Sequence, residues 1–238
     1  MDNRKIWAVL PAAGRGQRFS KTELKQYQTL LDKTVLQHSV NALTKLPLAG
    51  CVIAIHLDDH IATSLDFAMP VQFCQGGAER MDSVLAALQH LQSQAQPDDY
   101  VLVHDAARPC LHNDTLQAIL DFCQSGQDAA IVAIPVRDTL KLAKNLSKEN
   151  NGLHYIDKTI SREQMWQAQT PQIVKYQLLV DALQSAKQQQ AIITDEASSL
   201  ELLGVDVGLI SGRNDNIKIT YPEDLPLAEL ILKSWIKD

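Results

Sequence analysis

The chain has 238 residues, 45% of them apolar, and a formal net charge of −6. This size and composition suit a globular protein with one large core, and the acidic balance argues against a nucleic acid as partner. No apolar run approaches the roughly 20 residues of a membrane span, and the amino end MDNRK lacks a signal-peptide core. We therefore expect a cytoplasmic protein that has no membrane partner.

The stretch at residues 6–25 carries the most information. Residues 6–11 (IWAVLP) are almost wholly apolar, which predicts a strand buried on both faces. The small-residue loop AAGRG follows, in which Gly14 and Gly16 are free to take positive φ and to aim backbone N–H groups at one point. Four cations come next, namely Arg15, Arg18, Lys21 and Lys25. Amides and fixed positive charge together suit a nucleoside triphosphate.

Three kinds of glycine loop compete at this stretch. A Walker loop needs Lys and then Ser or Thr after the second glycine, where this chain has Gln17 and Arg18. A dinucleotide fingerprint needs a third glycine, where this chain has the bulky Phe19. The remaining pattern, G-x-G-x-R with Lys25 seven residues after Arg18, suits a triphosphate attacked at its α-phosphorus. A strand-to-helix turn with solvated basic residues stays open as the alternative.

Alternating elements continue along the next eighty residues. A helix over 34–46 with Thr34 as N-cap precedes a buried strand at 51–57, a helix at 58–67 and a short strand at 71–74. The loop GGAER then leads into an apolar helix opened by Asp82 and Ser83. Two adjacent glycines at a strand end repeat the design of the first loop, although a simple capped turn is the alternative.

The apolar run 100–103 predicts another strand, which ends in the segment HDAARP. Asp105 and Arg108 thus lie at a strand's carboxyl end, where open α/β sheets keep their ligands. Asp105 is a candidate magnesium ligand, because this ion prefers oxygen ligands and shares carboxylates with substrate phosphates. Alternatively, Asp105 serves as a helix N-cap or as the ion-pair partner of Arg108. His104 is interpreted as a hydrogen-bonded structural histidine.

The pattern changes after the helix predicted at 114–125 and the buried strand predicted at 129–136. Residues 137–143 and 154–160 alternate polar and apolar around a turn-rich segment, which predicts a two-stranded ribbon over 137–160. An isolated ribbon is only marginally stable in water, so we expect it to pack against a second subunit of a homodimer.

The remaining elements return to the alternating pattern. REQMWQAQTPQ leads back to a helix at 176–188, and Thr194-Asp195-Glu196 caps a helix that ends at Gly204. A strand at 207–210, a turn and strand over 212–220, and a closing helix from Pro222 to Lys237 follow. The order of elements predicts an α/β fold with one doubly wound, mostly parallel sheet, in a single domain spanning 1–238.

The motifs, taken in order, resemble those of the 2-C-methyl-D-erythritol 4-phosphate cytidylyltransferases of the non-mevalonate isoprenoid pathway. The resemblance spans nearly the whole chain and rests on PAAGRGQRF, GGAERMDSV, HDAARP, PVRDTLK, TPQ, ITDEAS and DNIKIT. It implies a Rossmann-like nucleotidyltransferase fold with a β-ribbon dimerisation arm. It also implies transfer of CMP from CTP to a small polyol phosphate, with magnesium as cofactor.

The family's residue roles carry over by motif. Arg18, Lys25 and Lys218 match its catalytic cations, and Asp105 matches its magnesium-holding aspartate. The segments that contact cytosine and ribose match Pro11, Ala12, Ala13, Gly14, Gly16, Gly76, Gly77, Ala78 and Ser83. Residues implied in binding the acceptor phosphate are Ala106, Arg108, Thr139, Arg162, Thr170 and Thr194. Among these, Thr139, Arg162 and Thr170 match residues that the family's arm brings to the neighbouring subunit's site.

Two positions depart from the family's pattern. Leu24 replaces a proline before Lys25, which predicts a loop less ordered without nucleotide. Ala78 replaces an acidic residue after the two glycines, which weakens the preference for CTP if that carboxylate reads the base. Two other functions remain open: a cytidylyltransferase for another polyol phosphate such as ribitol 5-phosphate, and a nucleotide-binding regulatory module without turnover.

Overall fold

The computed structural model describes residues 4–14, 19–20, 23–144 and 153–235. Two of the predicted site residues, Gly16 and Arg18, lie outside these ranges. None of the helices within them combines the length and apolar character that a membrane crossing needs. Cys51, Cys74 and Cys110 are free thiols.

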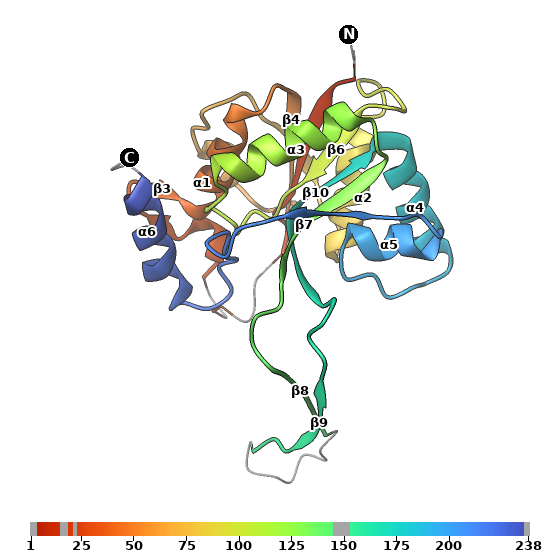
Figure 1. The fold of residues 1–238 in the computed structure, drawn as a ribbon. Coiled ribbons are helices and arrows are strands. Elements are labelled where there is room, and N and C mark those ends of the chain that lie inside the picture. The colour runs from red at the N-terminus through yellow and green to blue at the C-terminus, as the bar shows by residue number, and fades with distance from the viewer. Residues whose placement is uncertain (1–3, 15–18, 21–22, 145–152, 236–238) are drawn as a thin grey trace.

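A seven-stranded sheet organises the chain, in the order β11-β7-β10-β6-β1-β4-β5 (Figure 1). Its strands are β1 (Ile6–Pro11), β4 (Leu48–Ile55), β5 (Gln72–Gln75), β6 (Tyr100–Val103), β7 (Ala129–Pro135), β10 (Trp166–Lys175) and β11 (Gly208–Ser211). Neighbouring strands pair in parallel except at β10, which runs antiparallel to both β6 and β7. The predicted doubly wound, mostly parallel sheet is confirmed.

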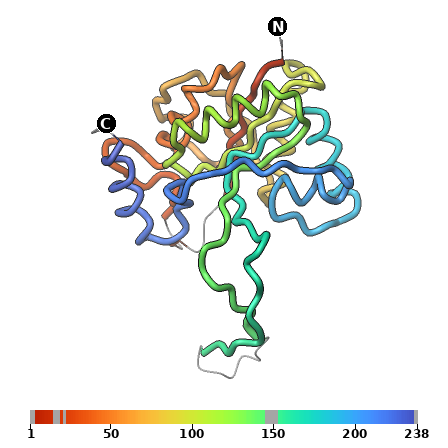
Figure 2. Tube along the Cα trace, in the orientation of Figure 1, coloured from red at the N-terminus to blue at the C-terminus, as the bar shows by residue number. Residues whose placement is uncertain are grey.

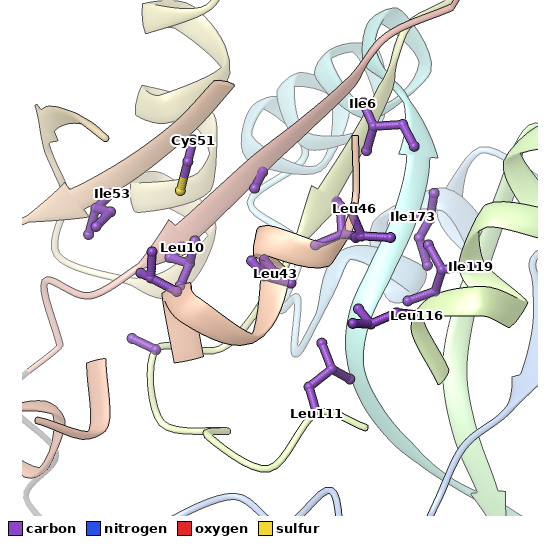
Figure 3. Close-up of a cluster of buried hydrophobic side chains, with 14 of the residues drawn as sticks. Ile6, Leu10, Leu43, Leu46, Cys51, Ile53, Leu111, Leu116, Ile119 and Ile173 are labelled. Atoms are coloured by element: carbon purple, nitrogen blue, oxygen red, sulfur yellow. The ribbon is translucent and has the colours of Figure 1, made fainter. Parts of the chain in front are cut away.

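Helices cover both faces of this sheet. One face carries α1 (Val35–Ala42) and α3 (Asn113–Ser125), and the other carries α2 (Arg80–His90), α4 (Tyr176–Gln188) and α5 (Glu196–Leu202). Strand β1 supplies alternate residues to the two cores. Ala8 and Leu10 pack towards α1 and α3, and Figure 3 shows Leu10 in this core. Trp7 and Val9 pack towards α2 and α4. Burial on both faces explains why β1 is a continuous apolar run.

Short elements join the main ones. They are β2 (Thr29–Leu30), β3 (Lys33–Thr34), the 3₁₀ turns η1 (Lys25–Tyr27), η2 (Leu43–Lys45) and η3 (Ala62–Ser64), and the closing helix α6 (Asp224–Trp235). Thr34 caps α1 in a capping box with Gln37, as its position predicts, and Asp195 forms a second capping box at α5. The closing helix begins at Asp224, two residues after Pro222.

Two predicted elements are wrong, and one strand was not predicted. Residues 58–67 form only the turn η3, because Ala62 is the one buried residue there and the partly buried Leu65 and Phe67 do not add up to a helical face. Residues 212–220 contain no strand after β11, because this segment leaves the sheet and packs on the loop after β6, where the Ile219 N–H donates to the Ala107 carbonyl at 2.8 Å. The strand that was not predicted is β10, since the sequence of this segment indicates only a connection to the helix at 176–188.

A two-stranded ribbon extends away from the body of the protein (Figures 1 and 2). Its strands β8 (Leu140–Ala143) and β9 (Ile156–Ile160) pair antiparallel, with Leu140 opposite Ile160. Leu142, Tyr155 and Ile156 expose 45–58% of their surface on it. These apolar side chains have no core of their own to pack against, which is typical of a surface that meets another chain.

Candidate active site

Two neighbouring cavities open at the carboxyl ends of β1 and β6. The glycine-loop cavity, of about 200 Å³, is lined by Pro11, Ala12, Gly14, Lys25, Gln26, Gly77, Ala78, Glu79, Arg80, Ser83, Asp105, Ala106, Ala107 and Lys218. The β10 cavity, of about 270 Å³, is lined by Arg80, Asp105, Arg108, Ala168, Gln169, Thr170, Gln172, Thr194, Asp195 and Lys218. The two cavities share Arg80, Asp105 and Lys218, so these side chains form a common wall.

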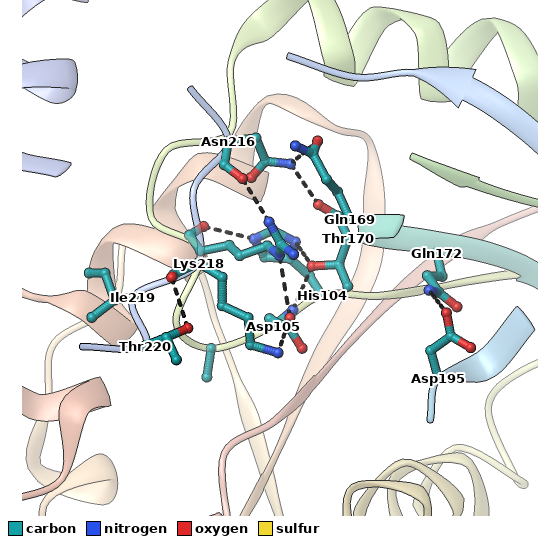
Figure 4. A network of polar contacts seen from close by, with 12 residues as sticks. His104, Asp105, Gln169, Thr170, Gln172, Asp195, Asn216, Lys218, Ile219 and Thr220 are labelled. Carbon is teal, nitrogen blue, oxygen red and sulfur yellow. Dashed lines mark hydrogen bonds and ion pairs between the residues drawn. The ribbon is translucent and has the colours of Figure 1, made fainter. Parts of the chain in front are cut away.

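Asp105 is the centre of this wall. Lys218 Nζ lies 2.8 Å from its Oδ2 (Figure 4). Arg108 Nε lies 3.3 Å from the same oxygen, while Arg80 Nε lies 3.3 Å from Oδ1. The Asp105 side chain is only 9% exposed. Burial alone would raise the pKa of Asp105, but Arg80, Lys218 and Arg108 together hold this pKa well below its usual range. The carboxylate is therefore fully ionised at neutral pH.

A chain of hydrogen bonds fixes the loop that carries Asp105. The Asp105 N–H donates to Thr170 Oγ1 at 3.0 Å, and Thr170 Oγ1 lies 3.1 Å from His104 Nδ1. His104 Nε2 lies 3.0 Å from the Arg108 carbonyl oxygen, which can only accept, so Nε2 carries the proton and Nδ1 accepts from the Thr170 hydroxyl. His104 is thus the structural histidine that the sequence predicted.

Stability is expected to fall as the pH is lowered through the titration of His104. Burial lowers the pKa of His104 to about 4 from 6.5, so the unfolded chain binds more protons than the folded one between these values. The free energy of unfolding should be lower by about 3 kcal/mol near pH 4 than at neutral pH. Denaturant unfolding between pH 7 and about 5.5 measures the beginning of this stability loss, because most carboxylates titrate at lower pH. A His104→Gln variant should show a flatter profile, and equal slopes in both proteins would contradict this assignment.

The glycine pair after β5 packs against the first loop. A Cβ at Gly76 would lie 2.6 Å from Ala13 Cβ, and one at Gly77 would lie 2.2 Å from Asp82 Cβ, so both positions require glycine. The Gly77 N–H donates to Ser83 Oγ at 3.2 Å. Gly76 and Ala13 therefore lie behind the cavity surface that Gly77, Ala78 and Ser83 form. Gly14 does not use its freedom to take positive φ, and a Cβ at this position would meet open space.

Lys25 reaches the same cavity from η1. Its Nζ donates to the Ile219 carbonyl at 2.9 Å, beside Lys218. The neighbouring Gln26 is buried and donates from Nε2 to the Ala12 carbonyl at 3.0 Å, which ties η1 to the end of β1. Two cations separated by most of the chain thus face one cavity, as their motifs predicted.

The β10 cavity contains several of the predicted acceptor-site residues. Arg108, Thr170 and Thr194 line it, whereas Ala106 lines the glycine-loop cavity instead. Arg108 Nη1 donates to the Asn216 carbonyl at 2.7 Å, which holds the guanidinium in place. Thr139 and Arg162 lie elsewhere, exposed near the base of the ribbon, where the Arg162 guanidinium donates to the Arg137 carbonyl. Within this subunit they line neither cavity.

Sequence reasoning missed two residues of the common wall. Arg80 was read only as the end of the GGAER loop, and Glu196 only as part of a helix cap. In the structure the Arg80 guanidinium is hydrogen-bonded to the buried carboxylate of Glu196 as well as to Asp105. The signal available in the sequence was an arginine three residues after a glycine pair at a strand end.

Comparison with known proteins identifies the family. The family model described as 2-C-methyl-D-erythritol 4-phosphate cytidylyltransferase matches residues 6–234. The chain belongs to this family. A relative of that name from Acinetobacter baumannii is 53% identical over 232 residues, covering 97% of this chain and 94% of the relative. One from Vibrio vulnificus is 43% identical over 228 residues, covering 94% of this chain and 93% of the relative. The protein is therefore a nucleotidyltransferase of the non-mevalonate isoprenoid pathway.

Solved structures of the cytidylyltransferase family have the same fold. The crystal structure of a 4-diphosphocytidyl-2C-methyl-D-erythritol synthase aligns with a TM-score of 0.81 at 34% identity, covering 97% of this chain and 99% of the other. The 2-C-methyl-D-erythritol 4-phosphate cytidylyltransferase of Francisella tularensis aligns with a TM-score of 0.80 at 30% identity, covering 95% and 99% respectively. The seven-stranded sheet is thus the sheet of this family.

Proposed function

We propose that the two cavities hold the two substrates of one transfer: CTP in the glycine-loop cavity and 2-C-methyl-D-erythritol 4-phosphate in the β10 cavity. The observation that carries this assignment is the common wall, where Arg80, Asp105 and Lys218 face both cavities. Two anions bound on either side of these side chains lie next to each other, which is the arrangement that phosphoryl-group chemistry requires.

The reaction is a direct in-line displacement. A phosphate oxygen of the acceptor forms a bond to the α-phosphorus of CTP, and the bond from that phosphorus to the bridging oxygen of pyrophosphate breaks. The products are 4-diphosphocytidyl-2-C-methyl-D-erythritol and pyrophosphate. A phosphate monoester with a second pKa of about 6 is mostly dianionic at neutral pH, so the attack needs no general base.

The side chains act by position and charge. Lys25 and Lys218 neutralise negative charge that builds up on the α-phosphorus and the leaving pyrophosphate, as does Arg18, which lies outside the described residues. Backbone and side chains of Ala12, Gly77, Ala78 and Ser83 contact the cytidine. Arg108, Thr170 and Thr194 bind the acceptor. Each role is supported by the cavity that the residue lines.

Asp105 is the residue that would hold magnesium. The described residues contain no group of three or more metal-binding His, Cys, Asp or Glu side chains, so a cage made by protein alone is not available among them. A single ionised carboxylate facing a triphosphate cavity fits magnesium well, because this ion takes one or two carboxylates together with substrate phosphates. When bound there, magnesium supplies additional positive charge to the phosphates.

A homodimer formed through the 137–160 ribbon of the single 1–238 domain completes the proposal. Thr139 and Arg162 lie on the extended part of the chain, away from their own cavities, which supports a role at the partner's site. We expect a dimer in sedimentation experiments. Mixing an Arg162→Ala variant with a Lys25→Ala variant should restore part of the activity, because mixed dimers contain one intact site. A fully active monomer would contradict the dimer and this placement of Arg162.

The test of the function is a substrate matrix. The four nucleoside triphosphates are each offered with magnesium to 2-C-methyl-D-erythritol 4-phosphate and to ribitol 5-phosphate, and pyrophosphate release is followed. The proposal predicts release from CTP with the first acceptor. Preference for ribitol 5-phosphate would favour the other cytidylyltransferase function. Binding of CTP without any release would favour a regulatory module.

A further inference from the structure

Arg80 and Lys218 occupy comparable positions in the common wall of the two cavities. Among the described residues, these two are the cations that line both cavities. They reach Asp105 from opposite sides, with Arg80 Nε 3.3 Å from Oδ1 and Lys218 Nζ 2.8 Å from Oδ2. The Arg80 side chain keeps 26% of its surface exposed. Its guanidinium therefore combines fixed placement with access to bound anions.

Glu196 explains how Arg80 is held. This residue begins α5, its side chain is 1% exposed, and its Oε1 accepts a hydrogen bond from Arg80 Nη1. Its other oxygen, Oε2, is buried with no hydrogen-bond partner among the described residues. A buried carboxylate with so few partners depends on the one cation that contacts it. Glu196 lines neither of the two cavities, so it holds the guanidinium without taking up space in them.

The charges of the cluster leave room for an anion. Arg80, Arg108 and Lys218 surround Asp105, and Glu196 lies behind Arg80. Lys25 adds a further cation in the glycine-loop cavity. The two cavities are also lined by the carboxylates of Glu79 and Asp195, so their described lining holds four cations (Lys25, Arg80, Arg108 and Lys218) and three carboxylates, which leaves one positive charge in excess. An arginine that served only to pair with buried Glu196 would have no reason to face both cavities.

We propose that Arg80 is a further substrate-contacting cation of the transfer, which binds both phosphoryl groups from the side of Asp105 opposite Lys218, and that Glu196 is the positioning residue that holds it there. This inference rests on the proposed function, because the anions that Arg80 binds are the phosphates of the two substrates. Guanidinium groups bind phosphate with a planar pair of donors, which suits a site between two phosphoryl groups.

The first test replaces Arg80 by Gln. We expect kcat/KM to fall by about two to three orders of magnitude, as for the loss of one preorganised charge-stabilising donor. The control is Lys175→Gln, since Lys175 pairs with Asp128 and Asp98, has a similarly exposed side chain at 21%, and lies at the other end of the sheet. The control should keep normal kinetics. Because Arg80→Gln leaves Glu196 without its cation, thermal unfolding is measured alongside.

The second test separates positioning from stability. The double variant Arg80→Gln/Glu196→Gln removes both buried charges, so it should recover folding stability while staying as slow as Arg80→Gln alone. In otherwise wild-type protein, Glu196→Asp, which is one methylene shorter, should lower kcat/KM more than Glu196→Gln, which can still accept from Nη1. Neither Glu196 substitution should lower kcat/KM further once Arg80 is Gln, because Glu196 acts through Arg80.

Calorimetric binding of CTP with magnesium, in the absence of acceptor, distinguishes failure of this inference from failure of the function. We expect Arg80→Gln to bind CTP about tenfold more weakly than the wild-type chain. A wild-type chain that binds CTP through Arg80 but releases no pyrophosphate would overturn the proposed function and leave the binding role standing. A folded Arg80→Gln variant with CTP affinity and kcat/KM within about threefold of wild type would overturn the inference.

Discussion

Replacement of Lys25 by Ala is expected to lower turnover by about two to three orders of magnitude and to leave the fold intact. The Lys25 side chain lines the glycine-loop cavity and its Nζ donates to the Ile219 carbonyl, beside Lys218. An ammonium held at this place stabilises charge that develops in the transition state. Single-turnover measurement of pyrophosphate release reports the chemical step, and circular dichroism checks the fold.

The matched control for this variant is Lys33→Ala. Lys33 lies in the short strand β3. Its side chain is 41% exposed and contacts Asp32 at the surface. Its loss should leave turnover unchanged, because an exposed ion pair contributes little. Near-normal pyrophosphate release by folded Lys25→Ala protein would count decisively against a catalytic role. The sequence motif predicts a loss of the same size for Arg18→Ala.

Replacement of Asp105 by Asn should reduce both activity and stability. Arg80, Arg108 and Lys218 would lose their common counter-charge inside a largely buried cluster. Breaking such a buried ionic cluster costs about 3 kcal/mol, which denaturant unfolding would detect. The carboxylate proposed to hold magnesium would also be lost, so kcat/KM should fall by about two orders of magnitude or more.

Magnesium titration separates these two effects of the Asp105→Asn substitution. The wild-type chain should lose activity when magnesium is removed by chelation and regain it on addition. The variant should need a higher magnesium concentration for half of its own maximal rate. Asp128→Asn serves as control, because Asp128 is 59% exposed and pairs with Lys175 at the other end of the sheet. An unchanged magnesium requirement in the variant would remove Asp105 as the metal ligand.

Elements buried on both faces were predictable from sequence with their bounds. Residues 6–11 and 100–103 are continuous apolar runs and form β1 and β6 as expected, and the amphipathic pattern of 176–188 gives α4. In these segments local pattern and tertiary packing favour the same structure. The glycine loops and Asp105 lie at strand ends, so their approach to one sheet edge followed from topology, whereas Lys25 and Lys218 reach it from the turn η1 and from the segment after β11.

The remaining features depend on contacts between distant segments. Strand β10 is exposed over Trp166 to Ala168 and buried from Gln169 onwards, so it shows neither steady alternation nor a continuous apolar run. The ion pair between Arg80 and Glu196 joins residues 116 positions apart, and nothing local distinguishes a buried glutamate from an ordinary helix cap. Strand β10 forms because it packs between β6 and β7. The ion pair forms because the fold brings Arg80 and Glu196 together at the common wall of the two cavities.

The stereochemistry at the α-phosphorus tests the central claim most directly, namely that two anions held side by side react with each other without a covalent enzyme intermediate. CTP with sulfur in place of one non-bridging α-oxygen is turned over with 2-C-methyl-D-erythritol 4-phosphate, and the configuration of the product is determined. A single in-line displacement predicts inversion. Retention would require two displacements through a nucleotidylated side chain and would contradict the account.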